Sequence, residues 1–150
     1  MPTIVVPQGF SFVLVASAST VFLNMWQHIR VNNARQAAKI DYPQMYAEKN
    51  EAASSKEAYI FNCVQRAHQN TLESLPHYLL NLFVTGLKRP YLSASLGALW
   101  LAGRIFYTIG YSSGDPKKRL TRGGYLSSAA LIGLILTSTY TVYEFVVEDL

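Results

Sequence analysis

The sequence predicts an all-α fold, an integral membrane four-helix bundle. Half of the 150 residues are hydrophobic, only 15% are charged, and there are 9 Gly and 6 Pro, a composition that excludes disordered and fibrous chains. The apolar residues gather in long runs almost free of charge, whereas helices of a water-soluble bundle would show a charged face. The basic residues gather between these runs, as they do in the loops on the cytoplasmic side of membrane proteins.

The first predicted span covers about residues 9–30. The stretch 9–26 (GFSFVLVASASTVFLNMW) is eighteen residues without a charge, close to the ~20 residues that cross a ~30 Å hydrocarbon layer. No Lys or Arg precedes it, whereas a cleaved signal peptide carries a basic segment before its apolar run. We therefore expect this segment to be retained as a transmembrane helix.

Three further spans are predicted at about residues 58–87, 91–112 and 122–147. In the second span, a polar stretch (61–73) must join the uncharged run 74–87 to reach the length of a span. The third is interrupted only by Arg104, and the fourth is free of charge from Gly123 until Glu144. With so little chain left over, we expect one domain over residues 1–150.

The loops between the spans differ in charge, which predicts their orientation. The first loop (30–56) and the third (112–122) together carry nine basic residues, and the short second turn carries two, Lys88 and Arg89. Four spans place the first and third loops on one side of the membrane. By the positive-inside rule this is the cytoplasmic side, and both termini lie on the other.

Two of the predicted helices carry long polar side chains at membrane depth, where a charge is costly and usually functional. At helical spacing each set shares one face: Arg66, Asn70 and Glu73 on the second span, and Arg104, Tyr107 and Tyr111 on the third. Guanidinium groups bind carboxylates, a carboxylate binds an ammonium group, and a phenol hydrogen-bonds a thiol. The two sets together suit a small ligand with several charges.

Local explanations remain open for each of these residues. Arg66 and Glu73 could pair across two turns, Arg104 could extend toward the interface, and the tyrosines could belong to an interfacial belt. Other chemistry has little support. The single cysteine, Cys63, cannot supply an internal disulfide or a multi-cysteine zinc site, and the three histidines are too scattered for a metal site.

Two blocks of sequence resemble the MAPEG family, the membrane-associated proteins of eicosanoid and glutathione metabolism. They are FNCVQRAHQNTLESLP (61–76) and GRIFYTIGYSSGDPKKR (103–119), and the pattern Ala34-Arg35 … Tyr42-Pro43 extends the similarity over nearly all of the chain. Within the family, the blocks look most like those of the type 3 microsomal glutathione S-transferases.

The resemblance implies a homotrimer of four-helix protomers, with glutathione bound between neighbouring protomers near the cytoplasmic side. It implies a microsomal enzyme of the endoplasmic reticulum or of the outer mitochondrial membrane. The implied activities are glutathione transfer to lipophilic electrophiles and glutathione-dependent reduction of lipid hydroperoxides. Glutathione is then the co-substrate, membrane lipids are partners, and neither a metal nor a nucleic acid takes part.

The resemblance also assigns roles to individual positions. The residues expected to bind glutathione are Arg35, Arg66, His68, Asn70, Glu73, Arg104, Tyr107 and Tyr111. The basic residue that activates the thiol aligns with Lys118 without a gap, or with Arg119 after a shift of one residue. We favour Arg119, because a guanidinium stays charged when partly desolvated, whereas a lysine can lose its proton.

Three other functions are weighed against this one. Ser74 and Gln36 stand where leukotriene-C synthase has a tyrosine and an arginine, which disfavours that activity. A non-catalytic lipid-binding scaffold of the same family would need neither the glutathione pocket nor a cation for the thiol. A channel or transporter would need a polar path across the membrane, whereas the polar residues stop halfway and the stretch 79–87 is largely apolar.

Overall fold

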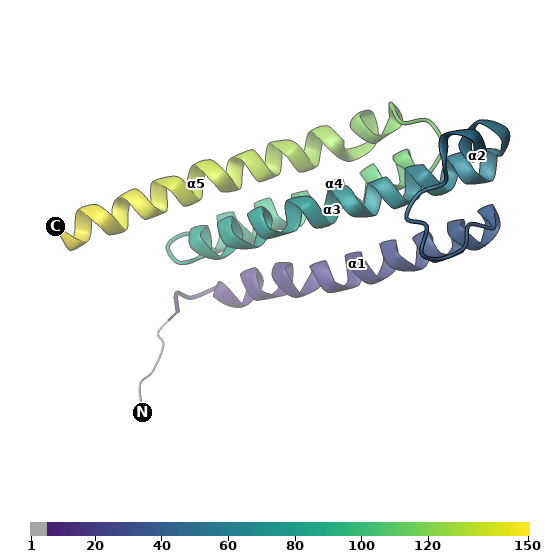
Figure 1. Ribbon diagram of the computed structural model, residues 1–150. Helices are drawn as coiled ribbons and strands as arrows, with labels where there is room; N and C mark the ends of the chain where they lie inside the picture. Colours follow the sequence, from purple (N-terminus) through teal and green to yellow (C-terminus); the bar gives the residue numbers. More distant parts are fainter. Residues whose placement is uncertain (1–5) are drawn as a thin grey trace.

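The computed structural model describes residues 6–150, which form a bundle of roughly parallel and antiparallel helices (Figure 1). Its elements are α1 (Phe10–Ala38), α2 (Lys49–Ser54), α3 (Lys56–Gly86), α4 (Pro90–Tyr111), a π-helical segment η1 (Leu120–Gly124) and α5 (Tyr125–Asp149). The all-α prediction is confirmed.

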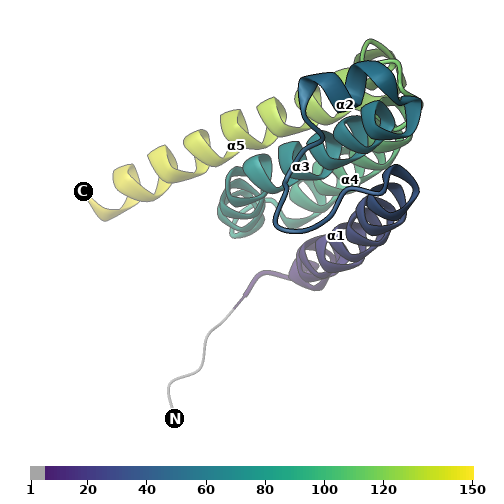
Figure 2. The ribbon, with the colours of Figure 1, turned by 45° about the vertical axis from the view of Figure 1, so that its right-hand side comes forward.

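The two middle helices hold the bundle together. α3 and α4 pack against each other, and α1 and α5 each pack against both of them from opposite flanks (Figures 1 and 2). At the centre the Tyr78 ring of α3 stacks on Trp100 of α4, with 4.0 Å between the ring centroids. The Tyr78 hydroxyl donates to the carbonyl of Gly97, 3.3 Å away, so this buried phenol is satisfied.

Three helical stretches are long and apolar enough to cross a membrane: α1, α4, and the stretch 120–149, which joins η1 and α5 across a kink at Gly123. Large apolar side chains point outward from them, including Phe22 at 72% exposure and Leu136 at 66%. An apolar surface of this extent suits lipid rather than water. The chain is therefore a membrane protein. α3 does not meet the same criterion, because charged and polar side chains occupy its first half.

The boundaries of the first helix differ from the prediction. α1 continues to Ala38, eight residues past the predicted end at residue 30. The basic and amide side chains of this last part are compatible with a helix, so the helix continues through them. Their polarity marks the point where the helix leaves the membrane. The helix ends at Lys39, whose backbone is left-handed (φ 55°).

The connections lie at opposite ends of the bundle, as the predicted topology requires. α2 with the rest of the first loop and the connection 112–119 lie at one end, and the 87–89 turn lies at the other, nearer the C-terminus (Figure 1).

At the end that holds the turn, polar contacts tie α3 and the turn to α5. Thr85 hydrogen-bonds Thr137 at 3.1 Å, and Arg89 binds Glu144 through two hydrogen bonds of 2.7 and 2.8 Å. The prediction that polar residues stop halfway along the bundle is therefore wrong. In sequence, a single threonine within an apolar run looks inert, but here Thr85 has a partner on the facing helix.

A close approach of backbones fixes the third loop against α4. A Cβ atom on Gly123 would overlap the carbonyl oxygen of Gly103 and would lie 2.5 Å from the backbone nitrogen of Tyr107. Only glycine permits this contact. Because η1 is held against α4, the residues just before it lie beside the polar end of α4.

Candidate functional site

Arg104 is the central charge of the site and is buried between α3 and α4. Its side chain is 5% exposed, so it does not extend to the interface. Nε and Nη2 donate to the Thr71 hydroxyl at 3.1 and 2.7 Å, and Nη1 donates to the Asn70 side-chain carbonyl at 3.1 Å. Its position next to Asn70 confirms that the two predicted polar faces meet.

No carboxylate neutralises this guanidinium in the described part of the chain. The ion pairs found among residues 6–150 are Arg66–Glu73, Lys88–Glu148, Arg89–Glu144 and Lys118–Asp115. Arg104 is held entirely by neutral acceptors. A buried ion without a counter-charge costs several kcal/mol, and an anionic ligand would recover much of that energy.

From Arg104, aromatic rings lead along α4 toward the third loop. The Arg104 guanidinium lies 4.1 Å from the centroid of the Tyr107 ring, and the Tyr107 and Tyr111 rings meet edge to face at 5.8 Å. The Arg119 guanidinium lies 5.2 Å from the Tyr111 ring. The pair of tyrosines therefore has one cation at each end, Arg104 beside Tyr107 and Arg119 beside Tyr111. This arrangement places positive charge and phenol hydroxyl groups side by side.

The two candidates for thiol activation point in different directions. Arg119 is half-buried and faces Tyr111, with Nη1 donating to the Pro116 carbonyl at 2.6 Å. Lys118 is exposed, and its Nζ lies 3.8 Å from a carboxylate oxygen of Asp115. The geometry therefore places Arg119, not Lys118, beside the tyrosines.

On α3, Arg66 and Glu73 are paired with each other. Arg66 donates to the two Glu73 oxygens at 2.8 and 3.3 Å, and both side chains are about half exposed. This is the local pairing that the sequence left open. An exposed pair of this kind contributes little stability, so a ligand with its own ammonium and carboxylate groups could replace it at small cost.

Arg35 and His68 lie apart from this group, on the side of the bundle where α1 meets α3. They line a cavity of 270 Å³ together with His28. Arg35 is buried, donates to the Gln44 carbonyl at 2.6 Å, and lies 4.7 Å from the ring of Phe61. Within this chain, Arg35 therefore organises the first loop and does not join the other predicted residues.

The sequence reasoning missed three buried polar residues that surround Arg104: Gln27 on α1, Thr71 on α3 and Thr108 on α4. The Gln27 amide donates to both threonine hydroxyls, at 2.8 Å to Thr71 and 2.7 Å to Thr108. A lone glutamine within the first predicted span was the available signal, since an amide at membrane depth needs partners.

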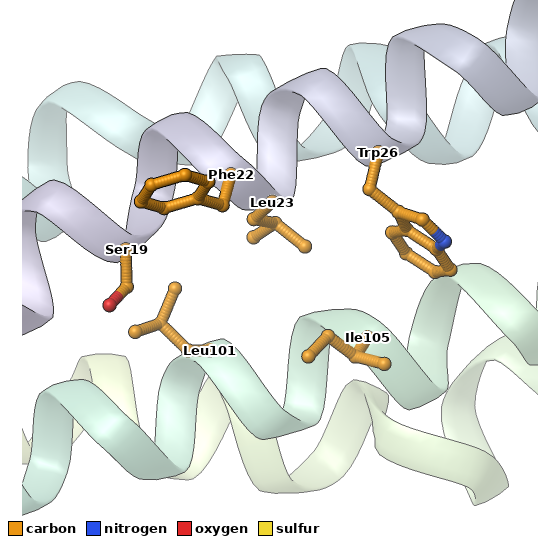
Figure 3. A pocket seen from close by; sticks show the side chains of 6 residues that line it. All are labelled: Ser19, Phe22, Leu23, Trp26, Leu101 and Ile105. Carbon is orange, nitrogen blue, oxygen red and sulfur yellow. The ribbon is translucent and has the colours of Figure 1, made fainter.

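An apolar groove lies between α1 and α4 on the outside of the bundle. Figure 3 shows side chains of both helices facing across it. The groove has a volume of 420 Å³ and is lined by Ser19, Phe22, Leu23, Trp26, Leu101 and Ile105. At its end nearest the first loop, the Arg30 guanidinium lies 5.1 Å from the Trp26 ring. Its lining suits an acyl chain or another apolar group.

Comparison with known proteins agrees with the resemblance. The sequence model of the MAPEG family matches residues 13–140. An uncharacterized protein of Synechocystis sp. is 36% identical over 80 residues, which are 51% of this chain. The matched region spans 58% of that relative's length. With the family match covering most of the chain, and with the helices and polar face described above, this protein belongs to the MAPEG family.

Proposed function

We propose that the protein is a membrane-bound glutathione transferase and glutathione-dependent peroxidase. The observation that carries the proposal is the buried Arg104, which is held by neutral acceptors next to Tyr107 and has no carboxylate partner among residues 6–150. A buried, uncompensated guanidinium favours an anion, and glutathione supplies carboxylates and an ionisable thiol. MAPEG membership supports this class of co-substrate.

The separation of the predicted residues supports an assembly of identical protomers. His68 lies ~160° around α3 from Arg66, because successive helical residues are ~100° apart. Arg35 shares the His68 cavity. One ligand molecule cannot contact both faces of a single α3. A neighbouring copy completes the site when its face that carries Arg35 packs against the face of the first copy that carries Arg66. Repeating this head-to-tail contact closes a ring.

We therefore expect a homotrimer with three glutathione sites at the contacts between protomers. α3 is then the fourth span: its 31 residues reach ~46 Å, and its polar face is covered by a neighbour instead of lipid. Crosslinking and native mass spectrometry in mild detergent should give trimers. A protein that is monomeric under these conditions and still binds glutathione fully would contradict the shared site.

The proposed chemistry begins with ionisation of the glutathione thiol. Arg119 stabilises the thiolate, since an opposite charge within ~4–6 Å lowers a thiol pKa by ~1–3 units, and the proton passes to solvent. In the transferase reaction the sulfur forms a bond to an electrophilic carbon while the leaving group departs. In the peroxidase reaction the sulfur takes one peroxide oxygen and the O–O bond breaks. The lipid alkoxide gains a proton, and a second glutathione converts the sulfenic acid to disulfide and water.

The acceptor is proposed to be lipophilic and to reach the site from the bilayer. The groove between α1 and α4 supports this, because its lining is almost entirely apolar and because it opens on the outward face of helices that span a membrane. The membrane of the endoplasmic reticulum is the expected location, with the outer mitochondrial membrane as the alternative.

Arg66→Ala is expected to weaken glutathione binding while the protein stays folded. Arg66 is exposed, and its only ion pair within residues 6–150 is with Glu73, so its loss affects stability by less than ~1 kcal/mol. Loss of a contact to a charged ligand group costs ~1.5–3 kcal/mol, which is a 10- to 150-fold weaker affinity. Isothermal titration calorimetry measures this value. A KM for glutathione within twofold of that of the unmodified protein would remove Arg66 from the site.

A non-catalytic lipid-binding scaffold is the alternative, and the apolar groove alone would serve it. An activity assay separates the two functions. The purified protein is given glutathione with either a model aryl halide or a lipid hydroperoxide. We expect turnover with at least one of them. Binding of lipid without turnover of either substrate would favour the scaffold.

A further inference from the structure

We propose that Gln27 is a positioning residue for Arg104, through the hydroxyl of Thr71. This inference rests on the proposed function, because the anion that Arg104 is positioned to bind is a group of glutathione. Gln27 lies on α1 and is 1% exposed, and its hydrogen bonds within residues 6–150 go to Thr71 and Thr108 rather than to Arg104. It acts by fixing the acceptor that Arg104 uses.

The directions of the hydrogen bonds in this network are determined by the backbone. The Thr71 hydroxyl donates to the Ala67 carbonyl at 3.1 Å, and the Thr108 hydroxyl donates to the Arg104 carbonyl at 2.8 Å. Each hydroxyl has one proton, so toward Gln27 both can only accept. The Gln27 NH₂ group must therefore face both threonines, and a flipped amide would place its oxygen against two acceptors.

Thr71 is the hub of the network. Its oxygen has two lone pairs; one receives the Gln27 amide at 2.8 Å, and the other is shared by two donors of Arg104, Nη2 at 2.7 Å and Nε at 3.1 Å. With its proton committed to the backbone and both lone pairs occupied, the hydroxyl has a single orientation. The Arg104 guanidinium is thereby held against α3, with its plane beside the Tyr107 ring.

Because the side chain at position 27 is a neutral amide, the positive charge of Arg104 stays available to bind an anion. A glutamate at position 27 would place a carboxylate one hydroxyl away from the guanidinium and offset its charge, whereas glutamine orients the same partner and remains neutral. This arrangement leaves the Gln27 carbonyl oxygen buried without a hydrogen-bond partner among residues 6–150. An unpartnered buried acceptor destabilises a protein, so packing alone does not explain a glutamine here.

The test compares four variants in the full-length protein in detergent. Gln27→Met keeps the length of the side chain and removes both donated hydrogen bonds. Gln27→Glu adds the carboxylate. Thr108→Val removes one of the two anchors of Gln27 without touching the Arg104 side chain. Thr85→Val is the matched control, since Thr85 is a fully buried threonine of α3 that hydrogen-bonds α5, far from Arg104.

We expect Gln27→Met and Gln27→Glu to weaken glutathione affinity tenfold or more, because the first frees the Thr71 hydroxyl that holds Arg104 and the second offsets the charge of Arg104, and either change weakens the charge-assisted contact between Arg104 and the ligand. Thr108→Val should weaken it by a smaller factor. Thr85→Val should change the melting temperature but leave the affinity within twofold. If Gln27→Met melts at a lower temperature but binds glutathione within twofold of the unmodified protein, Gln27 is only a packing residue and the inference is overturned.

A second readout separates failure of this inference from failure of the proposed function. The Nε–H signal of Arg104, assigned in NMR spectra with isotope-labelled arginine and the Arg104→Lys variant, reports its hydrogen bond to Thr71 without any ligand. It should exchange slowly with solvent in the unmodified protein and at least tenfold faster in Gln27→Met. If the unmodified protein does not bind glutathione, the proposed function fails, and this signal alone decides the role of Gln27. Equal exchange in both proteins would overturn the inference.

Discussion

Arg104→Leu should reduce glutathione affinity by about 30-fold to more than 1,000-fold, because loss of one partner of a buried charge pair costs ~2–5 kcal/mol. The same variant should be as stable as the unmodified protein, or more stable, without ligand. The reason is that Arg104 is buried with no counter-charge among residues 6–150, and replacing such an ion with an apolar side chain removes its desolvation cost.

Equilibrium dialysis with labelled glutathione and thermal melting in detergent measure these two quantities. Lys117→Leu is the control, since it removes one exposed positive charge of the third loop without altering the polar face. A structural role for Arg104 gives the opposite pattern, with a lower melting temperature and an affinity within a few-fold of normal. That pattern would contradict the assignment of Arg104 to the ligand.

Arg119→Ala should reduce the ionised fraction of bound glutathione at pH 7 by about 8- to 30-fold. A free thiol with a pKa of about 8.5 is about 3% ionised at pH 7, and a cation that lowers this pKa by ~1–3 units raises the fraction to about 24–97%. Near pH 9 the difference should shrink to less than about twofold. Turnover should fall less than the thiolate fraction, because a thiolate of higher pKa is the better nucleophile.

Lys118→Ala is the matched control for this experiment. Lys118 is exposed and paired with Asp115 at 3.8 Å, whereas Arg119 faces the ring of Tyr111. We expect the Lys118 variant to follow the pH profile of the unmodified protein. If Lys118→Ala loses neutral-pH turnover and Arg119→Ala retains it, the thiol activator is Lys118 and the one-residue shift in the alignment is wrong.

The helices could be predicted from the sequence because each apolar run is long and almost uncharged. The polar face of each of the two helices could also be predicted, since Arg104 and Asn70 each repeat at helical spacing with other polar residues. The end of α1 could not, because arginine and asparagine are compatible with helix on either side of the membrane surface. The pairing of Thr85 and Arg89 with α5 depends on which helices are neighbours, and periodicity within one helix carries no such information.

Arg35 and Gln27 show a second limit of reading the sequence. Arg35 was assigned to glutathione by its position in a motif, yet in one protomer its guanidinium binds the Gln44 carbonyl and lies over Phe61. Its proposed part in the ligand site depends on a neighbouring copy. Gln27 belongs to no motif, and its partners lie 44 and 81 residues away in the chain. Only the packing of α1 against α3 and α4 brings them together.

The most direct test of the central claim, that this site binds glutathione as a thiolate, is the ultraviolet absorbance of the thiolate. Glutathione is titrated into the purified protein at pH 7, where free glutathione is mostly protonated. We expect thiolate absorbance that saturates with the occupied sites and disappears on addition of S-methylglutathione, which competes but cannot ionise at sulfur. Saturable glutathione binding without thiolate absorbance, or no binding at all, would contradict the claim.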